Sequence, residues 1–228
     1  MIGAGELERW GILADGPWGG EGSRASGLAR FLLAEGQRVA YVAPPVSPWD
    51  ALAGTRRAGR TARRSESAAG HYPCEGLFVF TPWTWLPVRR WPLFDSNGTW
   101  NGNELFSRPR AGDIVREAGF ERADVLVVLG FEAAHLIRQF QAGRLVVVLA
   151  EDPTKAKTNP RVIRRRAQEI IGDADILAVT EERLLEADGA EDAWKTVVLG
   201  GEPDWGRLVG EVKPRIGTDR YGDPWRFP

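Results

Sequence analysis

The chain has 228 residues, of which 43% are hydrophobic and 27% charged, as is usual for a globular protein. Its formal net charge of −1 gives no sign of a surface built for nucleic acid, and a single cysteine, Cys74, excludes an intramolecular disulfide framework. Two histidines argue against a dedicated zinc site, so we predict no bound metal. No apolar run is long enough to cross a bilayer, and the first residues lack the basic start of a signal peptide, so we expect a cytoplasmic protein.

The first half of the chain contains three apolar runs, at residues 10–14, 38–43 and 76–81, and each predicts a buried strand. Between the first two runs, Ser23 can cap a helix that continues to about Ala34, and Gly36 ends it. Residues 51–70 are rich in Arg, Ala, Gly and Ser and predict an exposed loop. Part of the segment 102–118 predicts a further helix.

The second half alternates more regularly between strands and helices. Strands are predicted at residues 123–130, 144–150, 175–180 and 195–201, and helices at 132–140, about 160–172 and 181–187. Uninterrupted Val, Leu and Ile runs indicate strands that are covered on both faces, which is typical of parallel sheets. We therefore predict one doubly wound α/β domain over residues 1–205, with about seven mainly parallel strands, and an irregular tail over residues 206–228.

A glycine-rich loop, residues 16–23, follows the first predicted strand and leads into the helix. In an open parallel sheet, ligands bind at the carboxyl ends of the strands, so this loop is a candidate site. Its small residues would let the backbone approach a ligand, and free N–H groups at a helix start attract anions. The spacing fits a phosphate-binding loop and a plain tight turn equally well. The candidates for anion binding are Gly19, Gly20, Glu21 and Ser23.

Two common nucleotide-binding motifs do not fit this region. A P-loop needs a lysine here, and the chain has none before Lys155. A dinucleotide-binding fold needs the spacing G-x-G-x-x-G and an acidic residue after the second strand, where this chain has Ala43 and two prolines. We therefore expect neither NAD nor, by similar reasoning, S-adenosylmethionine, and no other cofactor.

Polar side chains after two later strands are candidates for acid–base chemistry or for binding hydroxyl groups. The alternative is structural: the acidic pair would flank the next helix, and the histidine would belong to the core. The catalytic candidates are Glu132 and His135, after the strand at 123–130, and Glu151 and Asp152, after the strand at 144–150.

A cluster of amide and aromatic side chains suits a sugar ring, which offers CH faces and hydroxyl edges, although such clusters also occur in plain loops. Its members, the candidates for binding an acceptor, are Asn97, Trp100 and Asn101. The basic stretch at residues 56–64, with Trp85 and Trp91 nearby, is compatible with peripheral contact to a membrane surface. A solvated loop explains the same stretch.

The order of these motifs resembles that of GT-B glycosyltransferases, in particular the family-4-like and teichuronic-acid-type enzymes. Residues 17–45 resemble the start of these enzymes, which has a glycine-containing loop, a helix with the pattern L-A-x-x-L-A-x-x-G-H-x-V and a strand that ends in a proline pair. Gln37 stands where histidine is common. The pattern is filled by Leu28, Ala29, Leu32, Leu33, Gly36 and Val39.

Three later segments extend the resemblance, which covers residues 10–205 in total. The segment VVVLAEDPT, residues 146–154, resembles the family's strand with a trailing acidic pair. The segment DADILAVTEERLLE, residues 173–186, resembles A-D-x-V-x-x-T-S-x-x-L, with Glu181 in place of the usual serine. The segment VVLGGEPDW, residues 197–205, resembles V-x-P-N-G-V-D, with Leu-Gly-Gly in place of Pro-Asn-Gly.

The resemblance implies a Rossmann-like domain equivalent to the N-terminal, acceptor-binding half of a GT-B glycosyltransferase. In that family the glycine loop reaches the diphosphate of a nucleotide-sugar donor, and the catalytic candidates above would position the hydroxyl of a sugar or glycan acceptor. The family's second domain, which holds the nucleotide, has no counterpart in this sequence, so a partner chain or a second copy would supply it. Two other hypotheses stay open: a non-catalytic binding or assembly module derived from such a domain, and an unrelated nucleotide-binding enzyme with a flavodoxin-like sheet.

Overall fold

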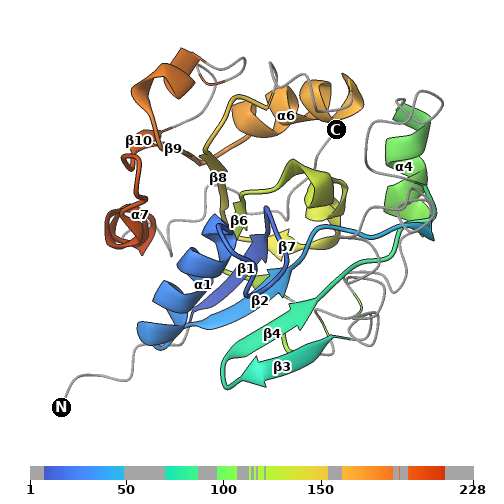
Figure 1. The fold of residues 1–228 in the computed structure, drawn as a ribbon, viewed down its shortest axis with the longest axis horizontal. Coiled ribbons are helices and arrows are strands. Elements are labelled where there is room, and N and C mark those ends of the chain that lie inside the picture. Colours follow the sequence, from blue (N-terminus) through green and yellow to red (C-terminus); the bar gives the residue numbers. More distant parts are fainter. Residues whose placement is uncertain are drawn as a thin grey trace.

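The computed structural model describes residues 8–48, 70–86, 97–106, 118–120, 122–153, 161–186 and 195–213, together with the single residues 113, 116 and 190. One sheet of eight strands forms its centre, and helices lie on both faces of that sheet (Figure 1). The exposed loop predicted at residues 51–70 lies, except for Gly70, outside the described residues.

Seven strands of the sheet are parallel, and they are the seven that the apolar runs predict. They are β1 (Arg9–Leu13), β2 (Arg38–Val42), β4 (Leu77–Phe80), β6 (Val125–Val128), β8 (Leu145–Leu149), β9 (Ile176–Val179) and β10 (Thr196–Val198). An eighth strand, β3 (His71–Cys74), pairs antiparallel with β4 at the edge. The order across the sheet is β10-β9-β8-β6-β1-β2-β4-β3, so the direction of winding reverses between β1 and β6. The single doubly wound sheet is confirmed.

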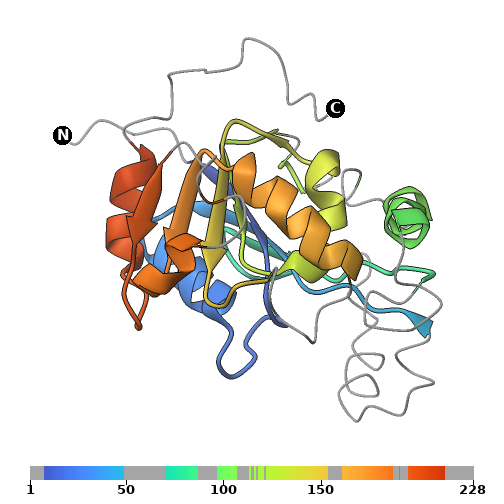
Figure 2. The same ribbon diagram turned by 90° about the horizontal axis from the view of Figure 1, so that it is seen from above.

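Side chains along each parallel strand alternate between two apolar layers. Leu13 of β1 belongs to the layer covered by the 3₁₀ helix η2 (Phe131–Gln139) and by α6 (Arg161–Gly172). Trp10 and Ile12 belong to the other layer, beneath α1 (Arg24–Ala34) and α7 (Trp205–Val212). Figure 2 shows α6 on one side of the sheet and α1 and α7 on the other. Because both faces are covered, the strands appear in the sequence as continuous apolar runs.

Several local predictions differ from the structure. The strand β3 and the short pair β5 (Arg122–Ala123) and β7 (Gln141–Ala142) were not predicted, because they are short and carry no apolar alternation. The helices predicted after β6 and β9 exist as the 3₁₀ helices η2 and η3 (Glu182–Glu186). The helix α4 (Asn97–Phe106) begins before the predicted segment 102–118.

The tail predicted to be irregular begins with a helix, α7. Asp204 caps it by accepting a hydrogen bond from the backbone N–H of Arg207 at 2.9 Å. Gly206 and Gly210 lower its intrinsic helix propensity, so its stability depends on packing against the rest of the chain. Its buried side chains, Leu208, Val209 and Val212, join the layer under α1. Residues 214–228 lie outside the described part of the chain.

Candidate functional site

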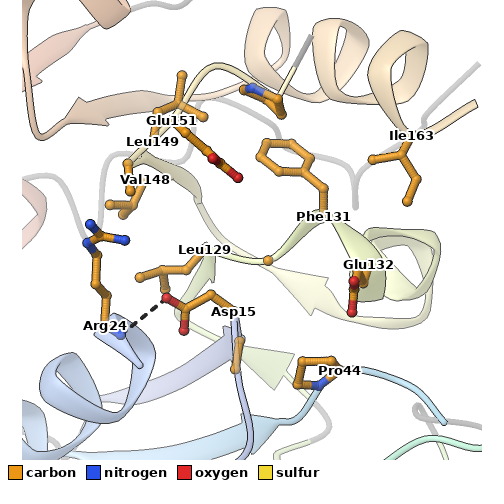
Figure 3. Close-up of a pocket in the computed structure, with 14 residues that line it drawn as sticks. Asp15, Arg24, Pro44, Leu129, Phe131, Glu132, Val148, Leu149, Glu151 and Ile163 are labelled. Atoms are coloured by element: carbon orange, nitrogen blue, oxygen red, sulfur yellow. Dashed lines mark hydrogen bonds between the residues drawn. The ribbon is translucent and has the colours of Figure 1, made fainter. Parts of the chain in front are cut away.

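A cavity of about 280 Å³ opens at the carboxyl edge of the sheet, where the strand order reverses (Figure 3). The segments that follow β1, β2, β6 and β8 supply most of its lining, and Ile163 of α6 and Arg24 of α1 complete it. This is the position at which doubly wound sheets bind their ligands. Of the predicted catalytic residues, Glu132 and Glu151 line this cavity, whereas His135 and Asp152 do not.

The ends of β1 and β6 approach each other closely beside the cavity, and Gly130 makes this approach possible. The backbone N–H groups of Leu129 and Gly130 both donate to the carbonyl of Leu13, at 2.9 and 3.0 Å. A side chain at position 130 would overlap the carbonyl oxygen of Ala14. Gly130 therefore lets the chain turn directly from β6 into η2, which brings Phe131 and Glu132 to the cavity.

The glycine loop between β1 and α1 is held by hydrogen bonds within the chain. Gly19 and Gly22 have positive φ angles of 69° and 75°, which glycine adopts without strain. The N–H of Gly19 donates to the hydroxyl of Ser26 at 3.3 Å, and the N–H of Gly20 donates to the carbonyl of Pro17 at 3.0 Å. None of the four predicted anion-binding residues is among those that line the cavity, and Glu21 is exposed to solvent.

The first N–H groups of α1 already have acceptors in the chain. The carboxylate of Asp15 accepts hydrogen bonds from the N–H of Arg24 at 3.1 Å, from the N–H of Ala25 at 3.3 Å and from the hydroxyl of Ser23 at 2.9 Å. Ser23 is the N-cap, as predicted, and accepts from the N–H of Ser26 at 3.2 Å. A donor diphosphate would have to displace Asp15 to reach these groups, so the predicted role of the loop in binding it stays a prediction.

Tyr41, near the end of β2, holds the glycine loop in place through hydrogen bonds of its hydroxyl. Burial raises the pKa of its phenol above the ordinary value of 10.0, so the hydroxyl is neutral at pH 7. It donates to the carbonyl of Gly16 at 2.7 Å and lies within 3.1 Å of the Ser23 hydroxyl. The ring of Trp18 packs edge-on against the Tyr41 ring, with centroids 5.4 Å apart. The loop is therefore positioned by β2 as well as by its own turn.

The cavity combines charged groups with an apolar wall. Figure 3 shows the carboxylates of Asp15, Glu132 and Glu151 around the opening and the ring of Phe131 between them. Among the described residues of the lining, Arg24 is the only cation. An apolar face surrounded by hydrogen-bond acceptors suits a ligand that offers hydroxyl donors and CH groups, such as a sugar ring.

Sequence reasoning missed Asp15, Arg24 and Phe131. Asp15 follows the end of β1 by two residues and Phe131 follows the end of β6 by three, so both lie where ligands bind in an open parallel sheet. Asp15 lies just past the strand predicted at 10–14, and Phe131 lies between the strand predicted at 123–130 and the helix predicted at 132–140, so neither was considered as a site residue. No sequence signal indicated that the first residue of α1, Arg24, would reach the cavity.

His135 is a core residue in this fold. It is 2% exposed on η2, and its Nδ1 donates to the carbonyl of Glu132 at 3.2 Å, since a carbonyl can only accept. Burial lowers the pKa of His135 from its ordinary 6.5 to about 4, while the hydrogen bond acts in the opposite direction. The imidazole is therefore neutral at pH 7.

The amide and aromatic cluster predicted to bind an acceptor lies on α4, away from the cavity lining. Asn101 is exposed, and the side chains of Asn97 and Trp100 lie outside the described part of the structure. A neighbouring amide has a clear structural role: the Asn103 side chain accepts from the N–H of Leu86 and donates to its carbonyl, both at 3.1 Å. Asn103 thus fixes α4 to the segment after β4.

The features that suggested membrane contact are described only in part. Trp85 is 61% exposed, whereas the basic stretch at 56–64 and Trp91 lie outside the described residues. None of the helices in the described segments is both long and apolar enough to cross a membrane. Within the same segments, no three His, Cys, Asp or Glu side chains are grouped so as to hold a metal ion.

Comparison with known proteins finds similarity in structure at low sequence identity. Neither the protein-family models nor the curated proteins gave a match to the sequence. Among solved structures, sucrose-phosphate synthase from Thermosynechococcus elongatus matches with a TM-score of 0.52 and 12% identity, over 93% of this chain and 98% of that chain. UGT89C1 from Arabidopsis thaliana matches with a TM-score of 0.41 and 13% identity, over 91% of this chain and 54% of that chain, a score too low to support a conclusion.

The match to sucrose-phosphate synthase extends over nearly the whole of both chains. At 12% identity this likeness concerns the fold and leaves substrates open. The described part of the chain thus has a Rossmann-like α/β fold, with one mainly parallel sheet of eight strands, that matches one half of a GT-B fold.

Proposed function

We propose that this chain is the acceptor-binding domain of a glycosyltransferase, which moves a sugar from a nucleotide-sugar donor to a hydroxylated acceptor held in the cavity. The observation that carries the proposal is the position of Glu132 and Glu151 on one cavity at the switch point of a GT-B-like half. The acceptor is a sugar or glycan, because the lining offers carboxylate acceptors beside the Phe131 ring.

The chemistry requires the acceptor hydroxyl to lose its proton while its oxygen bonds to the donor's anomeric carbon and the nucleoside diphosphate leaves. A carboxylate within hydrogen-bond reach of that hydroxyl orients it and can take the proton. Glu132 and Glu151 come from the ends of different strands, β6 and β8, so they can hold two hydroxyl groups of one ring. His135 has no part in this step, because it is buried outside the cavity.

The donor's nucleotide would be held by a second domain, from a partner chain or a second copy of this one. The isolated chain should therefore bind nucleotide sugars weakly. A Kd of roughly 1 μM or below, about −8 kcal/mol, for a UDP-, GDP- or TDP-sugar would contradict the proposal that a second domain binds the donor. We further propose that the protein is cytoplasmic, with exposed aromatic residues such as Trp85 available for peripheral membrane contact.

A panel of neutral monosaccharides and disaccharides, screened by saturation-transfer NMR, tests the acceptor site. Ligands of the wild-type chain should bind about tenfold or more weakly to Glu132→Gln and Glu151→Gln, because an amide loses charge-assisted hydrogen bonds. Glu182→Gln is the matched control, since Glu182 is an exposed carboxylate on η3 outside the lining. Unchanged sugar binding in both cavity variants would overturn the assignment of the site.

Transfer itself is tested with labelled nucleotide sugars, the sugars found by the screen and candidate partner chains. A labelled product that depends on Glu132 or Glu151 is the expected result. The alternative, a non-catalytic binding module, keeps the same cavity without the chemistry. Sugar binding without transfer, in the presence of a partner shown to bind both the chain and the donor, would favour that module.

A further inference from the structure

The side chain of Asp15 occupies the place where a helix N-terminus would hold an anion. Both of its oxygens are used: Oδ1 accepts from the Ser23 hydroxyl and from the N–H of Ala25, and Oδ2 accepts from the N–H of Arg24. α1 has 11 residues, so its first N–H groups carry the positive end of a substantial helix dipole. The chain's own carboxylate is direct evidence that these groups bind negative charge, and it already satisfies them.

Asp15 is more than a helix cap, because it also lines the cavity and is exposed to solvent there. The N-cap itself is Ser23, whose hydroxyl accepts from the N–H of Ser26 at 3.2 Å. A neutral hydroxyl at position 15 could accept some of the same hydrogen bonds. What only the aspartate adds is a negative charge at the opening of the cavity.

The charge at the opening decides which ligands fit. Three carboxylates, Asp15, Glu132 and Glu151, face one guanidinium, that of Arg24, so the lining is net negative. A phosphate or carboxylate group near α1 would meet like charge from Asp15 and would find the helix N–H groups already occupied. A hydroxyl or an ammonium group instead meets carboxylate oxygens, which can accept its hydrogen bonds without repulsion of like charge.

We infer that Asp15 is a specificity-determining residue: it closes the N-terminus of α1 to anions, so that the cavity selects a neutral or amino sugar over a sugar phosphate. The naming of the ligand as an acceptor sugar rests on the proposed function. The donor's diphosphate would then be held by the second domain. The role of the glycine loop is then structural: it positions Asp15 against the N-terminus of α1. Tyr41 stabilises the loop by a hydrogen bond to the carbonyl of Gly16.

Inorganic pyrophosphate, added to about 10 mM, is the probe that tests this filter without any knowledge of the true ligands. Amide chemical shifts of residues 16–25 report binding at α1 by NMR. The wild-type chain should show no saturable shift, whereas Asp15→Ser should bind with at least about tenfold higher affinity. This substitution removes the negative charge and both carboxylate oxygens from the N–H groups and leaves Arg24 in place. Asp15→Asn keeps the size and one acceptor oxygen, replaces the other oxygen with an NH2 group and removes the charge, so it should gain less than Asp15→Ser.

Asp204→Asn is the matched control, because the Asp204 carboxylate also accepts a hydrogen bond from a helix N-terminus, that of α7, but lies outside the cavity lining. It should leave pyrophosphate binding at α1 unchanged. If Asp15→Ser does not fold, as judged by thermal unfolding, Asp15→Asn carries the test alone. Pyrophosphate binding by the wild-type chain at residues 16–25, or no gain in any folded Asp15 variant, would overturn the inference.

A second measurement compares glucose, glucosamine and glucose 6-phosphate as NMR ligands of the wild-type chain and of Asp15→Asn. The ratio of glucose to glucose 6-phosphate affinity should fall by about tenfold in Asp15→Asn. A ratio that does not change overturns the filter. If none of these sugars binds the wild-type chain, the acceptor assignment fails, whereas a gain of pyrophosphate binding in Asp15→Ser still supports the filter.

Discussion

Lowering the pH should destabilise this protein through one side chain, His135. The folded state holds it neutral, since burial lowers its pKa from 6.5 to about 4. The unfolded chain takes up a proton on this residue at higher pH than the folded chain does. Between these two pKa values the unfolded state therefore binds more protons, and the free energy of unfolding falls as the pH falls. The whole difference in pKa is equivalent to about 3 kcal/mol, of which about 2 kcal/mol is lost between pH 7.5 and pH 5.

Urea unfolding, followed by tryptophan fluorescence at both pH values, measures this loss. His135→Asn keeps a side-chain N–H for the carbonyl of Glu132 and does not titrate, so its loss should be smaller than that of the wild type by about 2 kcal/mol. His71→Asn is the control, because His71 is the other histidine of the chain and is exposed on β3. An equal pH dependence in wild type and His135→Asn would refute the reasoning, as would an NMR titration of folded His135 near pH 6.5.

Three further substitutions test contacts and backbone conformations that hold the fold together. Gly130→Ala should cost about 3 kcal/mol of unfolding free energy, because its Cβ overlaps a backbone carbonyl at the end of β1; denaturant unfolding measures it. Gly19→Ala should cost about 1 kcal/mol by the same measurement, because φ is 69° there. Gly201→Ala is the control and should be nearly neutral, because a Cβ at either position meets no other atom but only Gly19 has a positive φ. Asn103→Ala should cost about 2 kcal/mol and speed protease cleavage in α4, since it leaves two backbone groups unpaired, and Asn101→Ala should do neither.

The sequence predicts the parallel sheet well because both of its faces are buried. Strands such as β6 and β8 are buried at every position, so they appear as apolar runs whatever covers them. The strand β3 is exposed at all four positions and has no such signal; only its pairing with β4 defines it. α7 has an apolar spacing that fits a helix, yet Gly206 and Gly210 argue against one, and packing against the α1 layer outweighs their cost.

The candidate site was predictable to the extent that it depends on strand ends. Glu132 and Glu151 were found because the carboxyl ends of β6 and β8 meet at the switch point. His135 was grouped with Glu132 by sequence spacing, but the direction in which η2 leaves β6 turns its ring into the core. A glycine-rich junction between strand and helix shows that an anion can bind. It does not show whether that anion belongs to a ligand or, as with Asp15, to the chain itself.

The openness of the cavity bears on how the chain could work. Asp15, Arg24 and Glu151 are exposed and Glu132 is half-buried, so three of the four charged groups in the lining are solvated in this structure. Hydrogen bonds and charges act most strongly on a transition state when water is excluded, because the local dielectric is then low. A glycosyltransferase site built on this edge would therefore need a second surface to cover it. A module that only binds sugars could function with the open cavity, at modest affinity. A test of whether turnover depends on a covering domain therefore distinguishes the two proposals better than a test of sugar binding.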